Sequence, residues 1–132
     1  MISMAITKIV TTADLGIGPI VVLEERDGER WFPIFIGHYE AAAIDREVLG
    51  IEPPRPLPHD LMYNIILEVG GKLEQVVVSE LRENTFFALL RIRTESGEIR
   101  EVDCRPSDAM ACAIRAKCPI YVEPDVLMRA AE

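Results

Sequence analysis

Two spacings of apolar residues divide this sequence into short elements. Alternation at every second residue, with many β-branched side chains, is typical of strands, and recurrence every three or four residues is typical of helices. The predicted strands are 2–12, 19–26, 30–36, 73–81, 85–95, 98–104 and 119–122. The predicted helices are 37–49, 60–69, 107–117 and 124–132. No periodic repeat or low-complexity segment interrupts this order of elements.

Turn residues predict how the first hairpin pairs. Asp27-Gly28 is typical of a type I′ turn, and closing such a turn here places Glu25 opposite Arg30, a pair of opposite charges. Pro33 has no N–H to donate to a neighbouring strand. We therefore expect the strand that contains Pro33 to lie at an edge of the sheet or at a bulge.

The hairpin around Gly97 allows two registers. A three-residue loop places Arg91 opposite Glu101, whereas a two-residue loop sets Arg93 against Arg100. Like charges directly opposite each other are unfavourable, so we expect the longer loop.

A proline-rich connector separates the first two predicted helices. Four prolines fall within 51–58, which predicts irregular backbone there, and the following helix begins at His59 or Asp60. Taken together, the elements predict one α+β domain over residues 1–132. Its mixed β-sheet is expected to carry three main helices packed on it and a short C-terminal helix.

Composition narrows the possible functions. The 132 residues are 49% hydrophobic, enough for one core, and 14 basic against 22 acidic side chains give a net charge of −8. This charge counts against loose, non-specific nucleic-acid binding, which would need a local basic patch or metal ions. Cys104, Cys112 and Cys118 form no CxxC motif, and no long apolar run or signal-like start is present. We expect a cytoplasmic protein with reduced thiols and no membrane association.

The third predicted helix has an unusually charged start. Pro106 suits the first helical position, and Ser107 and Asp108 can satisfy free N–H groups, so capping explains all three. Arg105 differs, because a cation beside a helix N-terminus opposes the helix dipole and needs a counter-charge. Asp103, on the same strand face, can supply it, and so can a phosphate held by Arg105 and the helix N–H groups.

The second predicted helix begins with similar residue types. Arg55 and Pro56 precede His59 and Asp60. A histidine in this place can be a general base or a metal ligand, and it is also an acceptable neighbour of a capping residue. Glu40, in the first turn of the first helix, is explained equally well as an acid favoured by the dipole.

Four blocks of this sequence, in this order and spacing, resemble the bifunctional nuclease family: PIFIGHYEAAAI, PRPLPHDL, FFALL and VDCRPSDAMACAIRAKCPIYV. The likeness runs from about Trp31 to Val122, and its most specific part is the Asp-x-Arg-Pro-Ser-Asp-Ala block of 103–109. The resemblance implies an α+β domain that acts on both RNA and DNA. One departure is Pro58, where the family commonly has Thr, so a role that needs a hydroxyl there is in doubt.

The resemblance also selects residues for the site. The residues that match the family pattern are Gly37, Glu40, Ala41, Arg55, Pro56, His59, Asp60, Asp103, Arg105, Pro106, Ser107, Asp108 and Arg115. Phosphodiester hydrolysis needs a phosphate clamp, an activated water and usually a divalent metal. The catalytic candidates are His59, Asp60, Asp103, Asp108 and Glu40, the substrate-binding candidates are Arg55, Arg105 and Ser107, and the candidate Mg²⁺ or Mn²⁺ ligands are Asp60, Asp103 and Asp108. No organic cofactor is implied, and we expect Asp103, Arg105 and Asp108 to cluster with at least one of Arg55, His59 and Asp60.

A non-catalytic function fits some of the same observations. The charge of −8 and the presence of only three lysines suit an anion-binding or regulatory interaction module as well as a nuclease. Trp31 is most simply a core residue, although an exposed Trp31 can stack on a base. An apolar sheet face in so small a chain, with a mean hydropathy of +0.16, predicts a homo-oligomer, most simply a dimer.

Overall fold

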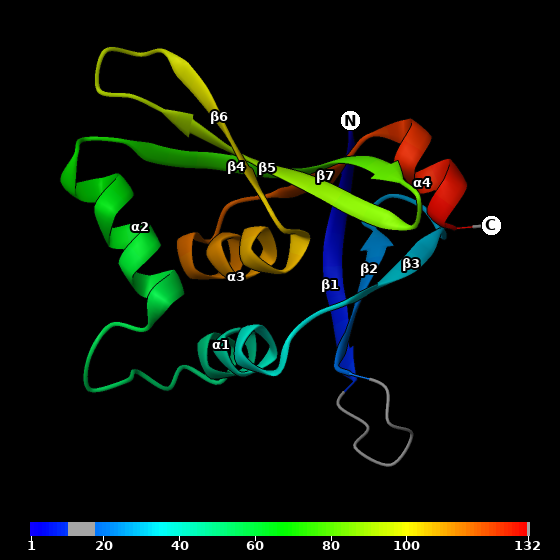
Figure 1. Ribbon diagram of the computed structural model, residues 1–132, viewed down its shortest axis with the longest axis horizontal. Helices are drawn as coiled ribbons and strands as arrows, with labels where there is room; N and C mark the ends of the chain where they lie inside the picture. Colours follow the sequence, from blue (N-terminus) through cyan, green and yellow to red (C-terminus); the bar gives the residue numbers. More distant parts are fainter. Residues whose placement is uncertain (11–17, 132) are drawn as a thin grey trace.

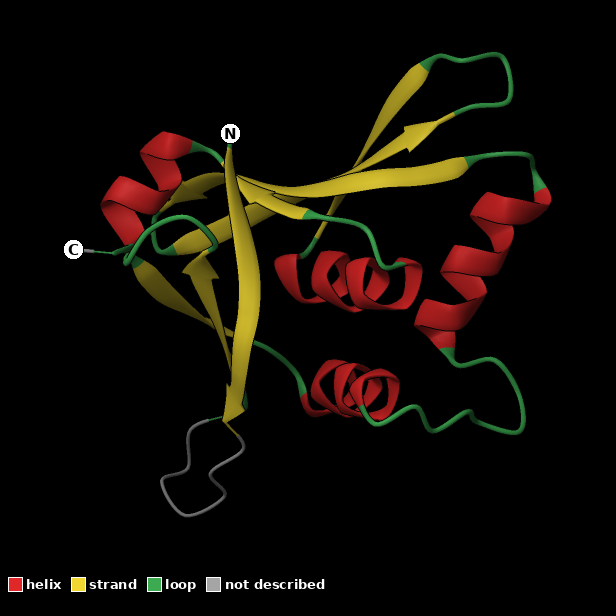
Figure 2. Cartoon of the chain, turned by 180° about the vertical axis from the view of Figure 1, so that it is seen from behind, coloured by secondary structure: helices red, strands yellow, loops and turns green. Residues whose placement is uncertain are grey.

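A mixed sheet of seven strands carries four helices in the computed structural model, which describes residues 1–10 and 18–131 (Figures 1 and 2). The strands are β1 (Ile2–Val10), β2 (Ile20–Glu25), β3 (Trp31–Phe35), β4 (Lys72–Arg82), β5 (Thr85–Arg93), β6 (Ile99–Cys104) and β7 (Ile120–Val122). The helices are α1 (His38–Val48), α2 (Pro58–Glu68), α3 (Pro106–Ala116) and α4 (Pro124–Ala130). The predicted α+β class, with three main helices and a short C-terminal one, is confirmed.

The sheet order is β3-β2-β1-β7-β4-β5-β6, with β4 and β7 parallel and all other neighbours antiparallel. In Figures 1 and 2, β1 and β2 run across the direction of β4 and β5. Phe32 of β3 stacks on Phe86 of β5, with ring centroids 5.4 Å apart, although four strands separate β3 from β5 in the sheet order. The sheet therefore curls strongly enough for its two halves to meet around the core.

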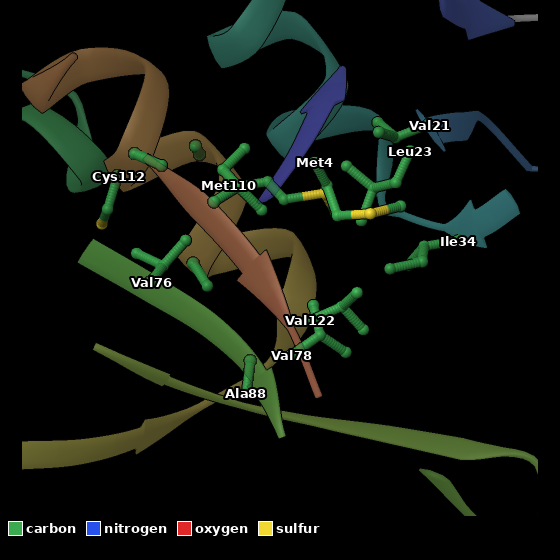
Figure 3. Close-up of a cluster of buried hydrophobic side chains, with 14 of the residues drawn as sticks. Met4, Val21, Leu23, Ile34, Val76, Val78, Ala88, Met110, Cys112 and Val122 are labelled. Carbon is green, nitrogen blue, oxygen red and sulfur yellow. The ribbon is translucent and has the colours of Figure 1, made fainter. Parts of the chain in front are cut away.

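Helix α3 fills the concave side of this curled sheet. Its residues Ala109, Met110, Ala111, Cys112 and Ala113 are all buried, and α3 packs against α1, α2, β4 and β5. Figure 3 shows Met110 and Cys112 among the aliphatic side chains of β1, β2, β4 and β7. Small side chains let neighbouring elements approach α3 closely on most of its sides. This close packing accounts for the small apolar side chains along most of α3. The polar residues at the start of α3 lie at one end of the packed region.

Most predicted strand pairings are confirmed. Arg91 lies opposite Glu101, with a 2.9 Å hydrogen bond between their side chains, and Pro33 lies in β3 at the sheet edge. Glu25 pairs with Arg30 in the predicted register, at 3.0 Å.

The prediction of a type I′ turn is wrong, because such a turn needs a positive φ at both Asp27 and Gly28, and neither residue has one. Instead the Glu25 carboxylate folds over the loop and accepts the Arg30 backbone N–H at 2.9 Å. Residues 13–18, which separate the first two predicted strands, fall largely outside the described residues.

Helix α2 begins earlier than predicted. Pro58 is its first residue and Leu57 its N-cap, so the irregular connector ends one residue sooner. Asp60 is the third helical residue, and its Oδ2 accepts the Leu57 N–H at 2.9 Å in the manner of a capping box. Proline at the first helical position sacrifices no hydrogen bond, which favours this earlier start. Within the described residues, no helix has the length and apolar character needed to cross a membrane.

Candidate active site

The first turns of three helices meet at one place. Glu40 is the third residue of α1, His59 the second of α2, and Asp108 the third of α3, whose N-cap is Arg105. Hydrogen bonds join these four side chains, which we call the Arg105 cluster. Free N–H groups give each helix start a partial positive charge, so the surroundings favour negative groups.

Arg105 receives its counter-charge from two carboxylates. Its Nε donates to Asp108 Oδ2 at 2.8 Å, and its Nη2 donates to Asp108 Oδ1 at 2.9 Å and to Glu40 Oε1 at 3.0 Å. These bonds raise the pKa of Arg105, so the guanidinium stays charged. Its side chain is 67% exposed, and Nη1 donates to none of the described residues. The cluster therefore presents unused N–H groups to solvent.

His59 is held against Asp108 from the side of α2. Its Nε2 lies 2.9 Å from Asp108 Oδ1, and only 9% of the residue is exposed. Burial opposes ionisation of Asp108, but hydrogen bonds from Arg105 and then His59 outweigh it and lower the pKa of Asp108. An ionised carboxylate only accepts hydrogen bonds, so Nε2 carries the shared proton. In the neutral ring Nδ1 is then an unprotonated acceptor, as a general base requires.

Gly37 allows Glu40 to reach the cluster. Gly37 is the N-cap of α1, and a Cβ placed there would collide with the Glu40 carboxylate. Glu40 therefore folds back over the helix start and reaches Arg105, which lies 65 positions further along the chain. Glycine, which has no Cβ, leaves room for this close approach of the Glu40 carboxylate.

Asp60 forms a separate ion pair beside the cluster. Its Oδ1 accepts from Arg115 Nε at 3.0 Å, while its Oδ2 caps the start of α2. The Arg115 guanidinium also lies over the Tyr63 ring, 5.2 Å from its centroid. Both oxygens of Asp60 thus have partners, which gives this residue a complete structural role.

Arg55 lies in the proline-rich connector and lines a cleft of about 250 Å³ together with Asp60 and Arg115. A smaller adjoining hollow is lined by His59, Asp60 and Arg115. Among the described residues, Arg55 makes no hydrogen bond or ion pair with the Arg105 cluster and lines a different hollow, so the structure separates the two candidate phosphate-binding arginines.

Asp103 lies on the other side of the sheet. It lies in β6, where it pairs with Leu89 of β5; it is exposed and lines a hollow with Ser79 and Glu80. Strand alternation turns Cys104 toward the core and Asp103 away from it. The predicted convergence therefore holds for Arg105, Asp108 and His59, with Glu40 added, and fails for Asp103.

Ser107 is the second residue of α3, and it is buried with 6% of its surface exposed. It lines a hollow beside Arg105 rather than occupying the N-cap position. This position leaves Ser107 close to any group that binds at Arg105.

The three predicted metal ligands do not share one site. Asp108 bonds to Arg105 and His59, Asp60 bonds to Arg115, and Asp103 lies on the outer sheet face. In the part of the chain that the structure describes, no three His, Cys, Asp or Glu side chains are grouped to hold a metal ion. Carboxylates already engaged by arginines are poor ligands for Mg²⁺ or Mn²⁺, so the donors present do not fit a shared ion.

Sequence reasoning missed one lining residue beside the cluster. Phe35 of β3 is 65% exposed and shares a hollow of about 470 Å³ with Arg105. The available signal was strand alternation, which places Trp31, Pro33 and Phe35 on one face of β3.

Comparison with known proteins gives the family. A sequence model described as the bifunctional nuclease domain matches residues 21–132. An uncharacterized protein of Mycobacterium tuberculosis is 46% identical over 112 residues, which are 85% of this chain and 66% of that protein. Bifunctional nuclease 1 of Arabidopsis thaliana is 26% identical over 107 residues, covering 79% of this chain and 33% of the plant protein.

Bifunctional nuclease 2 of Oryza sativa subsp. japonica is 28% identical over 108 residues, again 79% of this chain and 33% of the relative. The chain thus spans just under two thirds of the mycobacterial relative and a third of the plant ones. The family match covers most of the chain and includes all four members of the Arg105 cluster. This chain belongs to the bifunctional nuclease domain family.

Proposed function

We propose that this domain hydrolyses phosphodiester bonds of RNA and DNA at the Arg105 cluster. The observation that carries the proposal is the 2.9 Å contact between His59 Nε2 and Asp108 Oδ1, made beside an exposed arginine. A histidine oriented by a carboxylate, next to a cation that can hold a phosphate, is a workable arrangement for activating water. The two plant relatives are named bifunctional nucleases, which supports the same reaction class.

In the proposed mechanism each member of the cluster has one role. Nη1 of Arg105 donates to a phosphate oxygen, and the adjacent helix starts favour the charge that develops on it. Nδ1 of His59 accepts the proton of the attacking water, while Asp108 holds the ring and stabilises its protonated form. Glu40 fixes the guanidinium in place. The leaving oxygen takes its proton from His59 or from solvent.

Charge limits how strongly the cluster attracts a phosphate. Glu40 and Asp108 outweigh the single charge of Arg105, so directed hydrogen bonds must provide most of the binding. Mg²⁺ or Mn²⁺ accompanying the substrate remains a prediction, and no step is assigned to it because the carboxylates present do not form a shared site.

A non-catalytic anion-binding or interaction module is the second candidate. The observation that favours it is the pairing of Arg105 with two carboxylates, which already answers its need for a counter-charge. In that case the cluster mainly joins α1, α2 and α3, and the family's nuclease activity does not extend to this chain.

Cleavage assays separate the two candidates. Single-stranded RNA, single-stranded DNA and duplex DNA are incubated with the protein, with EDTA, Mg²⁺ or Mn²⁺. Loss of the His59 base should lower cleavage at least about 100-fold in His59→Gln. Asp103→Asn is the matched control, since this exposed carboxylate lies outside the cluster, and it should cleave like wild type. Equal cleavage by His59→Gln and wild type, or no cleavage by either, contradicts the nuclease proposal.

A homodimer is part of the proposal. Helix α2 buries only His59 and Ile66; it exposes Leu61 and Ile65 at 53% each, and its C-cap Val69 is 70% exposed. These three residues follow one another at intervals of four positions, so they form one row along the side of the helix. Rows with this spacing are the ones that interlock when two helices pack together. Light scattering should give a dimer mass that Ile65→Glu reduces to the monomer. A monomer mass for wild type at micromolar concentration contradicts this part.

A further inference from the structure

The outer face of β3 presents aromatic side chains to solvent. Trp31 is 55% exposed and Phe35 65% exposed, while Phe32 and Ile34 between them point into the core. Pro33 lies between the two exposed rings on the same face. Apolar side chains that are exposed side by side, unlike single exposed ones, often mark a binding surface, so this face is a candidate for one.

This face leads directly to the Arg105 cluster. Phe35 and Arg105 line the same hollow of about 470 Å³, which also includes Asn84 and Ser107. Two residues after Phe35, the chain reaches Gly37, the N-cap of the helix that carries Glu40. A ligand lying along β3 would therefore arrive at the exposed end of Arg105.

We infer that a single-stranded nucleic acid lies along β3, with bases stacked on Trp31 and Phe35 and a phosphate at Arg105. This inference rests on the proposed function and names the form of its substrate. Aromatic platforms bind every base through its π-face, which suits a protein that acts on both RNA and DNA. Duplexes are excluded from such a platform, because their bases stack on each other.

The spacing of the two rings sets which bases of a strand can reach them. Trp31 and Phe35 are four residues apart in β3, so at about 3.3 Å per residue they lie about 13 Å apart. Consecutive bases cannot span this distance, so the two rings would receive bases of an extended single strand that have at least one nucleotide between them. Pro33 fills the space between Trp31 and Phe35 without offering an N–H.

Two other features of this face bear on the occupant. Lys8 lies on it, since Lys8 pairs with Val22, which pairs with Pro33. Glu24, which pairs with Trp31, lies there too. The two charges offset each other, so the aromatic rings and the exposed Arg105 carry the binding of the strand. A second copy that extended the sheet at this edge would need an unbroken row of donors, and Pro33 removes one.

Trp31 is the only tryptophan of the chain, so its fluorescence reports on this face alone. A 12-nucleotide oligodeoxythymidine is titrated into His59→Gln, in which cleavage should be at least about 100-fold slower, and into the same variant carrying Phe35→Leu or Phe35→Tyr. Anisotropy of a labelled oligonucleotide measures binding independently. Ile99→Ala is the matched control, an exposed apolar residue on the opposite edge strand β6.

Stacking predicts that the oligonucleotide quenches Trp31 fluorescence. It also predicts that Phe35→Leu weakens binding by about 5- to 150-fold, while Phe35→Tyr and Ile99→Ala stay within about twofold. Binding without a change at Trp31, unchanged binding by Phe35→Leu, or no binding at all overturns the inference. It is also overturned if Phe35→Leu dissociates a dimer while oligonucleotide binding stays the same. If an oligonucleotide quenches Trp31 fluorescence but is never cleaved by wild type, the proposed hydrolysis is overturned and the inference of base stacking on β3 is kept.

Discussion

Replacing Arg105 by alanine should destabilise the fold chiefly through repulsion between the carboxylates it now separates. Glu40 Oε1 and Asp108 Oδ1 lie 3.0 and 2.9 Å from the same Nη2 atom, so they are at most about 6 Å apart. Their side chains are only 11% and 19% exposed. Without the guanidinium, two poorly solvated negative charges face each other.

The size of the effect follows from Coulomb's law. Two unit charges about 6 Å apart repel by roughly 3 kcal/mol at an effective dielectric constant near 20 and by about 0.7 kcal/mol in bulk water. Water enters the space left by Arg105, whose side chain is 67% exposed, so we expect a loss of about 1–2 kcal/mol. For a chain of this size that corresponds to a fall in Tm of roughly 3–8 °C.

A double-mutant cycle tests the origin of this loss. Urea unfolding is measured for wild type, Arg105→Ala, Glu40→Gln and the double variant. Glu40→Gln should recover part of the stability lost in Arg105→Ala, because it removes one of the two repelling charges. The matched control combines Arg115→Ala with Asp60→Asn. No recovery is expected there, since the described residues give Asp60 no opposing carboxylate partner and Asn weakens its capping bond.

Two outcomes refute the reasoning. If Glu40→Gln further destabilises Arg105→Ala, repulsion is not the cause of the loss. Cleavage by the same preparations tests the functional role, because the double variant should be stable and still inactive. Recovery of cleavage together with stability shows that Arg105 only holds the fold and does not bind phosphate.

Three further predictions concern the same region. Burial opposes ionisation of Asp108, but its hydrogen bonds with Arg105 and His59 hold its pKa below the ordinary value near 4. The ionised carboxylate therefore contributes fully to stability above about pH 4, and this contribution disappears as the pH falls through the lowered pKa. The unfolding free-energy gap between wild type and Arg105→Ala should therefore narrow below about pH 4, and a constant gap from pH 7 to 3 contradicts this. Gly37→Ala should displace the Glu40 carboxylate and lower Tm by a few degrees, whereas an unchanged Tm in thermal melts contradicts the close approach. Burial raises the pKa of the Cys112 thiol to about 12, so iodoacetamide at pH 8 should label it only after unfolding, and mass spectrometry of the folded protein detects any exception.

Local chemistry in the sequence was enough to predict most elements and their pairing. The register of Arg91 with Glu101 followed from charge pairing across one short loop, and the edge position of Pro33 followed from its missing donor. The start of α2 was misplaced because Asp60 serves equally well as an N-cap or as the third residue of a capping box, and the choice depends on Leu57.

The site was only partly predictable, because its contacts join distant parts of the chain. The helix dipole correctly required a counter-charge for Arg105, but the nearby Asp103 faces the opposite side of the sheet. The actual partners include Glu40, 65 positions away, and His59 reaches Asp108 across 49 positions. Such pairs depend on how α1, α2 and α3 pack, which residue spacing does not encode.

The weak anchoring of α2 makes the histidine the most easily detached member of the cluster. This helix buries only two of its residues, one of them His59 itself, whereas the start of α3 is embedded in the core. Segments with few buried contacts open locally at a lower free energy than the rest of a protein. Mild heating or low denaturant should thus release His59 while Arg105 and Glu40 stay paired on their own helices. The proposed activity would then vanish in a state whose sheet is still folded, and a partner bound to α2 would restore it without touching the substrate.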